Sequence, residues 1–160
     1  MSFLLLALLL WAALADAVEI VALSFIIAPL KCHFDLSPLQ LSLLTSTIFA
    51  GLFIGSFVWG SVGDQIGRRR GLIMTLSINA TFGLLSAVAT SYVQLVACRF
   101  LSGLGVGGSI PLIWAYASEI SPASKKGFFM SILSMSWMVA NVAISLLAYA
   151  MGLIKHFPKI

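Results

Sequence analysis

Residues 60–70 read GSVGDQIGRRR and form one of the few strongly charged stretches in a very apolar chain. Hydrophobic runs long enough to cross a bilayer lie on both sides of this stretch. Three arginines and an aspartate need water or lipid headgroups to solvate them. The stretch is therefore predicted to be a turn at the membrane surface, and the side on which it lies sets the direction of the flanking helices.

The composition of the chain is that of an integral membrane protein. Of its 160 residues, 61% are hydrophobic and only 9% are charged, whereas roughly a quarter of the residues in a soluble domain are charged. The apolar runs are continuous and rich in Leu, Ala and Gly, unlike the alternating strands of a membrane β-barrel. Helices satisfy all of their backbone hydrogen bonds internally. The predicted fold is therefore all-α, a polytopic bundle of transmembrane helices.

Five membrane spans are predicted from the positions of the polar breaks. They cover approximately residues 2–30, 39–62, 71–91, 92–120 and 128–153. Between the first two spans, Asp35 or Ser37 can cap the helix that follows. Residues 3–15 also resemble the core of a signal peptide, but no Lys or Arg precedes them, and cleavage would leave residues 16–30 too short to span. One long first helix is the preferred interpretation.

The basic residues predict the orientation of the spans. Arg68, Arg69 and Arg70 lie two spans away from Lys125 and Lys126, so both groups are expected on the same face of the membrane. By the positive-inside rule this face is cytoplasmic, and the N-terminus is cytoplasmic with it. The net charge of +4 is explained by this topology, so nucleic acid is not an expected partner.

Three charged side chains are predicted to lie inside the bilayer. Asp16 and Glu19 are three residues apart near the middle of the first span, so they share a helix face. Arg99 lies roughly 10 Å below the outer end of the fourth span, at about 1.5 Å per residue. Such charges commonly mark substrate, proton or cation sites, so we expect these three residues to face a substrate or ion cavity. The alternatives are structural hydrogen bonds or an ion pair with Arg99 for the carboxylates, and snorkelling to the interface for the arginine.

Small residues predict where helices approach each other closely. Gly51 and Gly55 in the second span, and Gly103 and Gly107 in the fourth, are each four residues apart and share a face. These faces are expected to pack tightly against other helices, and smooth faces of this kind could also slide or rock. Glu119, at the inner end of the fourth span, is expected either to form a charge network with Arg68–Arg70 or to be an ordinary solvated charge.

The sequence offers no signature of catalysis. It contains no nucleotide-binding glycine loop, metal-ligand cluster or hydrolase triad. The glycines near Gly103 lie inside an apolar helix, so they cannot cradle phosphates as a loop does. Two cysteines are too few for a disulfide framework. Neither enzymatic activity nor a metal or cofactor is expected.

Three motifs of the chain resemble those of the major facilitator superfamily. They are GxxGDxxGRRR at residues 60–70, RFxxGxGxGG at residues 99–108 and ExSP at residues 119–122. Within the superfamily the chain is most similar to synaptic vesicle 2-related proteins and to the organic-ion and sugar transporter branch. The segments ADAVE, APLKC and LLTS, at residues 15–19, 28–32 and 43–46, carry that similarity.

The resemblance implies roles for individual residues. Arg99 would face the central cavity. The cytoplasmic ends of the helices would form a gate that locks the two halves of the carrier. The residues that the resemblance assigns to this gate are Gly60, Asp64, Gly67, Arg68, Arg69, Glu119 and Lys126.

The expected function is transport of a small organic solute by alternating access. The protein would be a secondary active carrier such as a symporter, with H⁺ or Na⁺ as the candidate coupling ion. Carriers of this family have two six-helix halves, so five spans are expected to be an N-terminal fragment, or to act with a missing C-terminal half or a full-length relative. The alternative is a truncated, non-transporting membrane protein that binds or regulates a full-length relative. The lipid bilayer is a partner in both cases, in either the plasma membrane or an intracellular vesicle.

Overall fold

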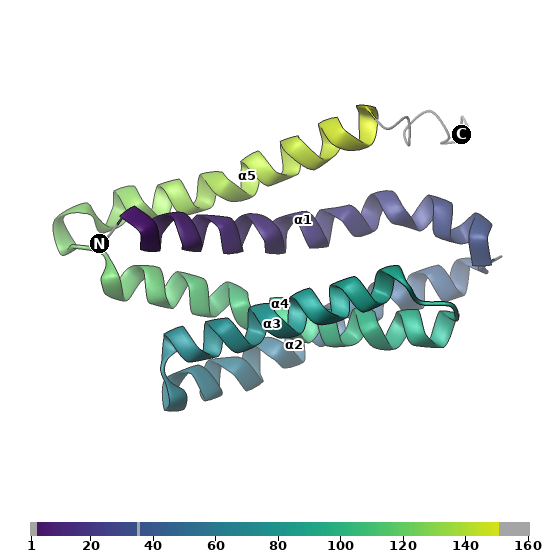
Figure 1. The fold of residues 1–160 in the computed structure, drawn as a ribbon, viewed down its shortest axis with the longest axis horizontal. Helices are drawn as coiled ribbons and strands as arrows, with labels where there is room; N and C mark the ends of the chain where they lie inside the picture. The colour runs from purple at the N-terminus through teal and green to yellow at the C-terminus, as the bar shows by residue number, and fades with distance from the viewer. Residues whose placement is uncertain (1–2, 35, 151–160) are drawn as a thin grey trace.

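The structure is a bundle of five long helices joined by short connections (Figure 1). This computed structural model describes residues 3–34 and 36–150, without the side chains of residues 3, 4, 26, 28, 29 and 31–34. No strand occurs among these residues, which confirms the predicted all-α bundle. The helices are α1 (Phe3–Phe34), α2 (Pro38–Ile66), α3 (Arg68–Ala87), α4 (Tyr92–Ile120) and α5 (Lys126–Ala150), with a 3₁₀ turn, η1 (Ala123–Lys125), before α5.

The helices form two groups in the bundle. In the first, α4 packs along both α2 and α3, and these are the most extensive contacts between the described helices. In the second, α1 packs against α5 and makes a smaller contact with α4. Figure 1 shows α1 lying between α5 and the group of α2, α3 and α4. The polar inner face of α1 is thereby placed against α3 and α4.

The start of α1, the α2–α3 junction and the α4–α5 junction lie at the same end of the bundle (Figure 1). Arg68–Arg70 and Lys125 with Lys126 are therefore at one end, as the positive-inside argument requires. That this end lies on the cytoplasmic face of the membrane stays a prediction.

Local sequence signals determine where α2 begins. Ser37 accepts a hydrogen bond from the Gln40 backbone N–H, and the Gln40 side chain accepts one from the Ser37 N–H. This capping box satisfies backbone donors that have no partner inside the helix. The Tyr92 hydroxyl at the start of α4 donates to the Gln40 carbonyl oxygen at 2.9 Å, which ties the starts of the two helices together.

The turn within residues 60–70 is shorter than the sequence suggested. Helix α2 continues through Gly60 and Asp64 to Ile66, and α3 begins at Arg68, so Gly67 alone interrupts the helices. Gly67 has a φ of 92°, a left-handed conformation that glycine adopts without a Cβ penalty. Its N–H bonds to the Gly63 carbonyl oxygen, which closes α2 without a longer loop.

Four of the described helical segments are long and apolar enough to cross a membrane: Leu5–Phe25, Pro38–Ile66, Tyr92–Ile120 and Ala123–Ala150. The third predicted span, residues 71–91, corresponds to α3. This helix is not apolar enough to be counted with these four segments. Helix α3 begins with three arginines and carries several hydroxyl side chains and Asn79. It returns along the bundle beside α4 (Figure 1), and its polar groups include part of the site described below.

The contact between α2 and α4 depends on glycine at four positions. A Cβ added to Gly103 would lie 2.6 Å from the Ile48 carbonyl oxygen, and one added to Gly107 would collide with the Leu52 carbonyl. Across the same contact, Gly51 and Gly55 face backbone carbonyls of α4 in the same way. The absence of side chains lets the two backbones touch. The four glycines predicted to pack helices lie at this one contact.

Candidate functional site

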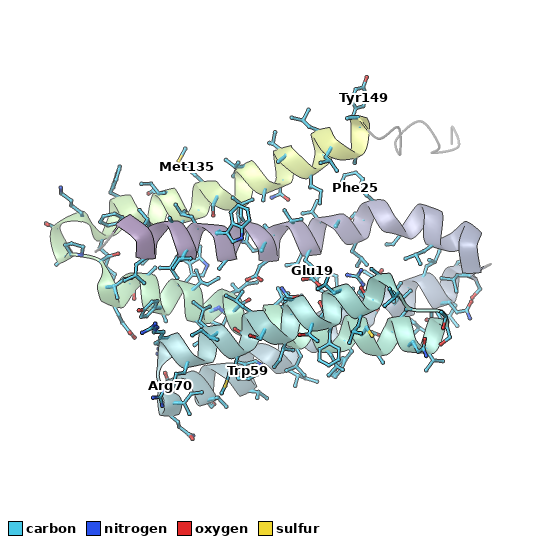
Figure 2. The ribbon with its side chains drawn as sticks, in the orientation of Figure 1. Glu19, Phe25, Trp59, Arg70, Met135 and Tyr149 are labelled. Atoms are coloured by element: carbon cyan, nitrogen blue, oxygen red, sulfur yellow. The ribbon has the colours of Figure 1, made fainter. Side chains whose placement is uncertain are left out.

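The two carboxylates of α1 point into the bundle, toward α3 and α4. Asp16 is completely buried, and the side chain of Glu19 is 21% exposed. Figure 2 shows Glu19 on the side of α1 that faces these helices. Both lie inside the apolar segment Leu5–Phe25, where a charge is costly unless it is paired or hydrogen-bonded. Their partners therefore decide what the site can do.

Asp16 is held by one hydrogen bond to each of its carboxylate oxygens. The Asn79 side-chain amide of α3 donates to Oδ1 at 3.2 Å, and the Ser109 hydroxyl of α4 donates to Oδ2 at 2.5 Å. Ser109 also lies 3.0 Å from the Val106 carbonyl oxygen of its own helix. Asp16 therefore ties α1 to α3 and α4, two of the three helices in the opposite group.

Glu19 contacts a cation and a hydroxyl of α4. Its Oε1 lies 3.8 Å from the Arg99 guanidinium and is hydrogen-bonded to the Ser102 hydroxyl. The Arg99 side chain is 12% exposed, so most of its charge is removed from solvent. The ion pair with Arg99, which the sequence left open as the structural alternative for the first-span carboxylates, is thus present for Glu19. It holds Arg99 inside the bundle.

Asn79 connects the two carboxylate sites. Its Oδ1 lies 3.2 Å from the Ser102 Oγ, while its Nδ2 donates to Asp16. The sequence alone assigned no role to Asn79, Ser102 or Ser109. One signal was available, because Ser102 and Ser109 follow Arg99 at helical spacing on the same face.

The site borders two cavities. A small one of about 20 Å³ is lined by Glu19, Arg99, Ser102, Gly103 and apolar side chains of α1, α2 and α4, and it has room for about one water molecule. A larger one of about 550 Å³ lies between α1 and α3 and extends from Arg69 to Glu19 and Asn79 along apolar walls. Glu19 and Arg99 line the small cavity, whereas Asp16 is buried and lines neither cavity. That these three residues form a substrate or ion site stays a prediction.

A second charged cluster lies at the end of the bundle where α2 meets α3. Arg68 contacts Asp64 at 2.6 Å and Glu119 at 3.3 Å, which links α2, α3 and α4. The Arg68 side chain is 28% exposed, and both carboxylates are more than half exposed. The network expected for Glu119 is thus formed with Arg68.

The other residues assigned to the predicted gate do not join this cluster. Gly60 and Gly67 lie nearby and face open space. Arg69 lines the larger cavity. Lys126, the first residue of α5, is exposed and makes no ion pair with any residue that the structure describes. Within the same described residues, no group of three His, Cys, Asp or Glu side chains could hold a metal ion.

Comparison with known proteins finds clear similarities. The family model of the Major Facilitator Superfamily matches residues 3–157. The synaptic vesicle glycoprotein 2A of Rattus norvegicus and that of Homo sapiens are each 35% identical over 146 residues, which is 91% of this chain and 19% of theirs. The synaptic vesicle glycoprotein 2C of Mus musculus is 32% identical over 146 residues, 91% of this chain and 20% of its own. The chain therefore spans about a fifth of the length of these curated relatives.

Proposed function

The chain belongs to the Major Facilitator Superfamily, and we propose that it forms part of a carrier that moves a small organic solute across a membrane by alternating access. The observation that carries this proposal is the polar cluster of Glu19, Arg99 and Ser102 at the border of a cavity inside an apolar bundle. A buried ion pair is weak evidence for stability, because its desolvation offsets its attraction. A role in binding the solute accounts for an ion pair at this position.

The chemistry of the cluster favours a polar or charged solute of small size. Arg99 offers several N–H donors in a planar fork, and Glu19 offers a carboxylate beside it. The two groups can bind an acceptor and a donor of the same solute at once. The glycine contact between α2 and α4 leaves a smooth surface beside the cluster, on which the helices can shift. H⁺ and Na⁺ are the candidate coupling ions, since Asp16 and Glu19 can bind either.

The cluster of Asp64, Arg68 and Glu119 is proposed as a gate at the cytoplasmic end. Alternating access requires one half of a carrier to rock against the other. The proposed carrier therefore joins these five helices with a second half, in the same chain or in a partner. Charge pairs that are partly exposed can break and form again at small cost, which suits a contact that opens in each cycle.

A ligand-binding experiment tests this proposal. The chain is purified in detergent, and its thermal midpoint is measured with a hexose, choline or lactate as probes of three solute classes. A solute that binds the folded state raises the midpoint. We expect one class to raise it, and we expect the Arg99→Gln variant to lose that response. A rise of equal size in Arg99→Gln would place the binding site elsewhere.

Asp64→Asn is expected to separate gating from folding. Asp64 is 63% exposed and Arg68 is 28% exposed, so solvent screens the pair and its loss should change the free energy of unfolding by less than about 1 kcal/mol. Membrane insertion should stay at the wild-type level. In a preparation that transports, the rate of solute uptake should fall because the gate closes less well. Wild-type uptake kinetics in Asp64→Asn would remove the gating role.

A further inference from the structure

We propose that the larger cavity, between α1 and α3, is a binding site for one anionic phospholipid, with the lipid phosphate at Arg69 and one acyl chain along the apolar walls. This cavity, the α1–α3 groove, has a volume of about 550 Å³. The proposed solute site lies at the small cavity that Arg99 lines, and Arg99 does not line the groove. The two sites are therefore separate.

The walls of the α1–α3 groove are long and apolar. On α1 the lining residues from Leu5 to Glu19 recur every three or four positions, so they form one stripe along the helix. This stripe is roughly 20 Å long, at about 1.5 Å per residue. The facing stripe on α3 runs from Arg69 to Ala80. An elongated apolar groove fits an extended hydrocarbon chain better than it fits a compact polar solute.

One side of the groove opens at the surface of the bundle. Leu8 and Trp11 of α1 and Ile73 of α3 line it and are each more than half exposed. Leu9 and Leu72 also line it and are buried, so they form its floor. Large apolar side chains that are exposed on a membrane bundle face lipid. A phospholipid can therefore place one chain in the groove from the side and leave its other chain in the bilayer.

The groove ends at a cation that has no partner in the described part of the chain. Arg69 lies at the end of the bundle where α2 meets α3, and its side chain is exposed. Its neighbour Arg68 pairs with Asp64 and Glu119, whereas Arg69 makes no ion pair with any residue that the structure describes. A guanidinium binds phosphate through two parallel N–H bonds. Arg69 is therefore available for a lipid phosphate at the predicted membrane surface.

The surrounding charges favour an anionic headgroup over a zwitterionic one. Among the described residues, five basic side chains lie at this end of the bundle against two carboxylates, and both carboxylates contact Arg68. The basic residues are Arg68–Arg70, Lys125 and Lys126. A choline group would bring a further positive charge into this field. Basic pockets between membrane helices commonly bind anionic lipid headgroups.

Polar side chains close the other end of the groove without requiring a polar ligand group. Glu19 contacts Arg99 and is hydrogen-bonded to Ser102. The Asn79 amide donates to Asp16, and its oxygen lies 3.2 Å from the Ser102 hydroxyl. These polar groups therefore already have partners inside the bundle, and the apolar stretch between them and Arg69 is left for the acyl chain.

Lipid-dependent unfolding of the purified chain tests the site. The chain is titrated in a nonionic detergent with phosphatidylglycerol or with phosphatidylcholine of the same acyl chains, and the thermal midpoint is measured. We expect phosphatidylglycerol, at about tenfold its Kd, to raise the midpoint by roughly 3–6 °C more than phosphatidylcholine does. This difference should shrink in about 1 M NaCl, because salt screens the headgroup contact but not the chain contact.

Arg69→Gln and Arg70→Gln are a matched pair of variants. Each removes one positive charge from the first turn of α3, but Arg69 lines the groove and Arg70, at the same end of the bundle (Figure 2), does not. We expect Arg69→Gln to lose the preference for phosphatidylglycerol and Arg70→Gln to keep most of it. Ala80→Phe fills the groove from the α3 wall and should lower the rise with both lipids. If Ala80→Phe does not fold, Ala15→Phe fills the groove from the α1 wall instead.

Three results would overturn the lipid site. Equal rises with the two lipids would mean that the headgroup is not recognised. A preference that Arg69→Gln and Arg70→Gln reduce equally would be a general attraction to the basic end of the bundle. No rise with either lipid would leave the groove to another occupant, such as a further helix of the carrier or a second copy of the chain. None of these results involves Arg99, so the lipid site can fail while the proposed solute site stands.

Discussion

Gly107→Ala is expected to lower the free energy of unfolding of the purified chain by about 3 kcal/mol. The added Cβ would collide with the Leu52 backbone, which cannot turn aside as a flexible side chain could. Helices α2 and α4 would have to separate along their contact, and this contact is the largest in the bundle. Denaturant titration in detergent micelles measures the loss.

Gly60→Ala is the matched control for this experiment. Gly60 also lies within a helix, and a Cβ added to it would meet nothing within 4 Å. The same chemical change should therefore be neutral there or stabilise the chain by up to about 1 kcal/mol, because alanine favours helix. Equal losses at the two positions would show that backbone contact is not what holds α2 against α4.

Arg99→Leu is expected to cost about 3 kcal/mol of stability. The substitution removes the cation beside Glu19 and leaves a carboxylate that is 21% exposed without its ion pair. Glu19→Gln in the same chain should restore most of the loss, because the unpaired charge is then gone. Thermal unfolding of the two single variants and the double variant measures this coupling. A double variant whose loss equals the sum of the single losses would mean that the two side chains do not interact.

The helices themselves could be predicted because each apolar run is long and ends at a clear break. Pro38 with Ser37 opens α2, Ser91 caps α4, and Pro122 separates α4 from η1 and α5. The α2–α3 turn could not be predicted as closely. Polar residues such as Asp64 fit the last turn of a helix that emerges from lipid as well as they fit a loop. Only the backbone hydrogen bond between Gly67 and Gly63 shows where the break lies.

The charged members of the site could be predicted because a charge inside an apolar span is rare and costly. Asp16, Glu19 and Arg99 were identified for that reason. The neutral members could not be identified in the same way. Serine on an apolar helix is equally consistent with close packing, with a bond to its own backbone and with a bond to another helix. Ser102 and Ser109 gain their meaning only because α1 brings its carboxylates opposite them.

Solute uptake into liposomes is the most direct test of the central claim, that the cluster at Glu19 and Arg99 binds a solute which the carrier moves. The 160-residue chain and the longest product of its gene are reconstituted in parallel, each as wild type and as Arg99→Gln. The account predicts saturable uptake of one class of the probes hexose, choline and lactate in a preparation that holds both halves of the carrier. It predicts that Arg99→Gln abolishes this uptake while the protein remains folded and inserted. Uptake with wild-type kinetics in Arg99→Gln would contradict the account.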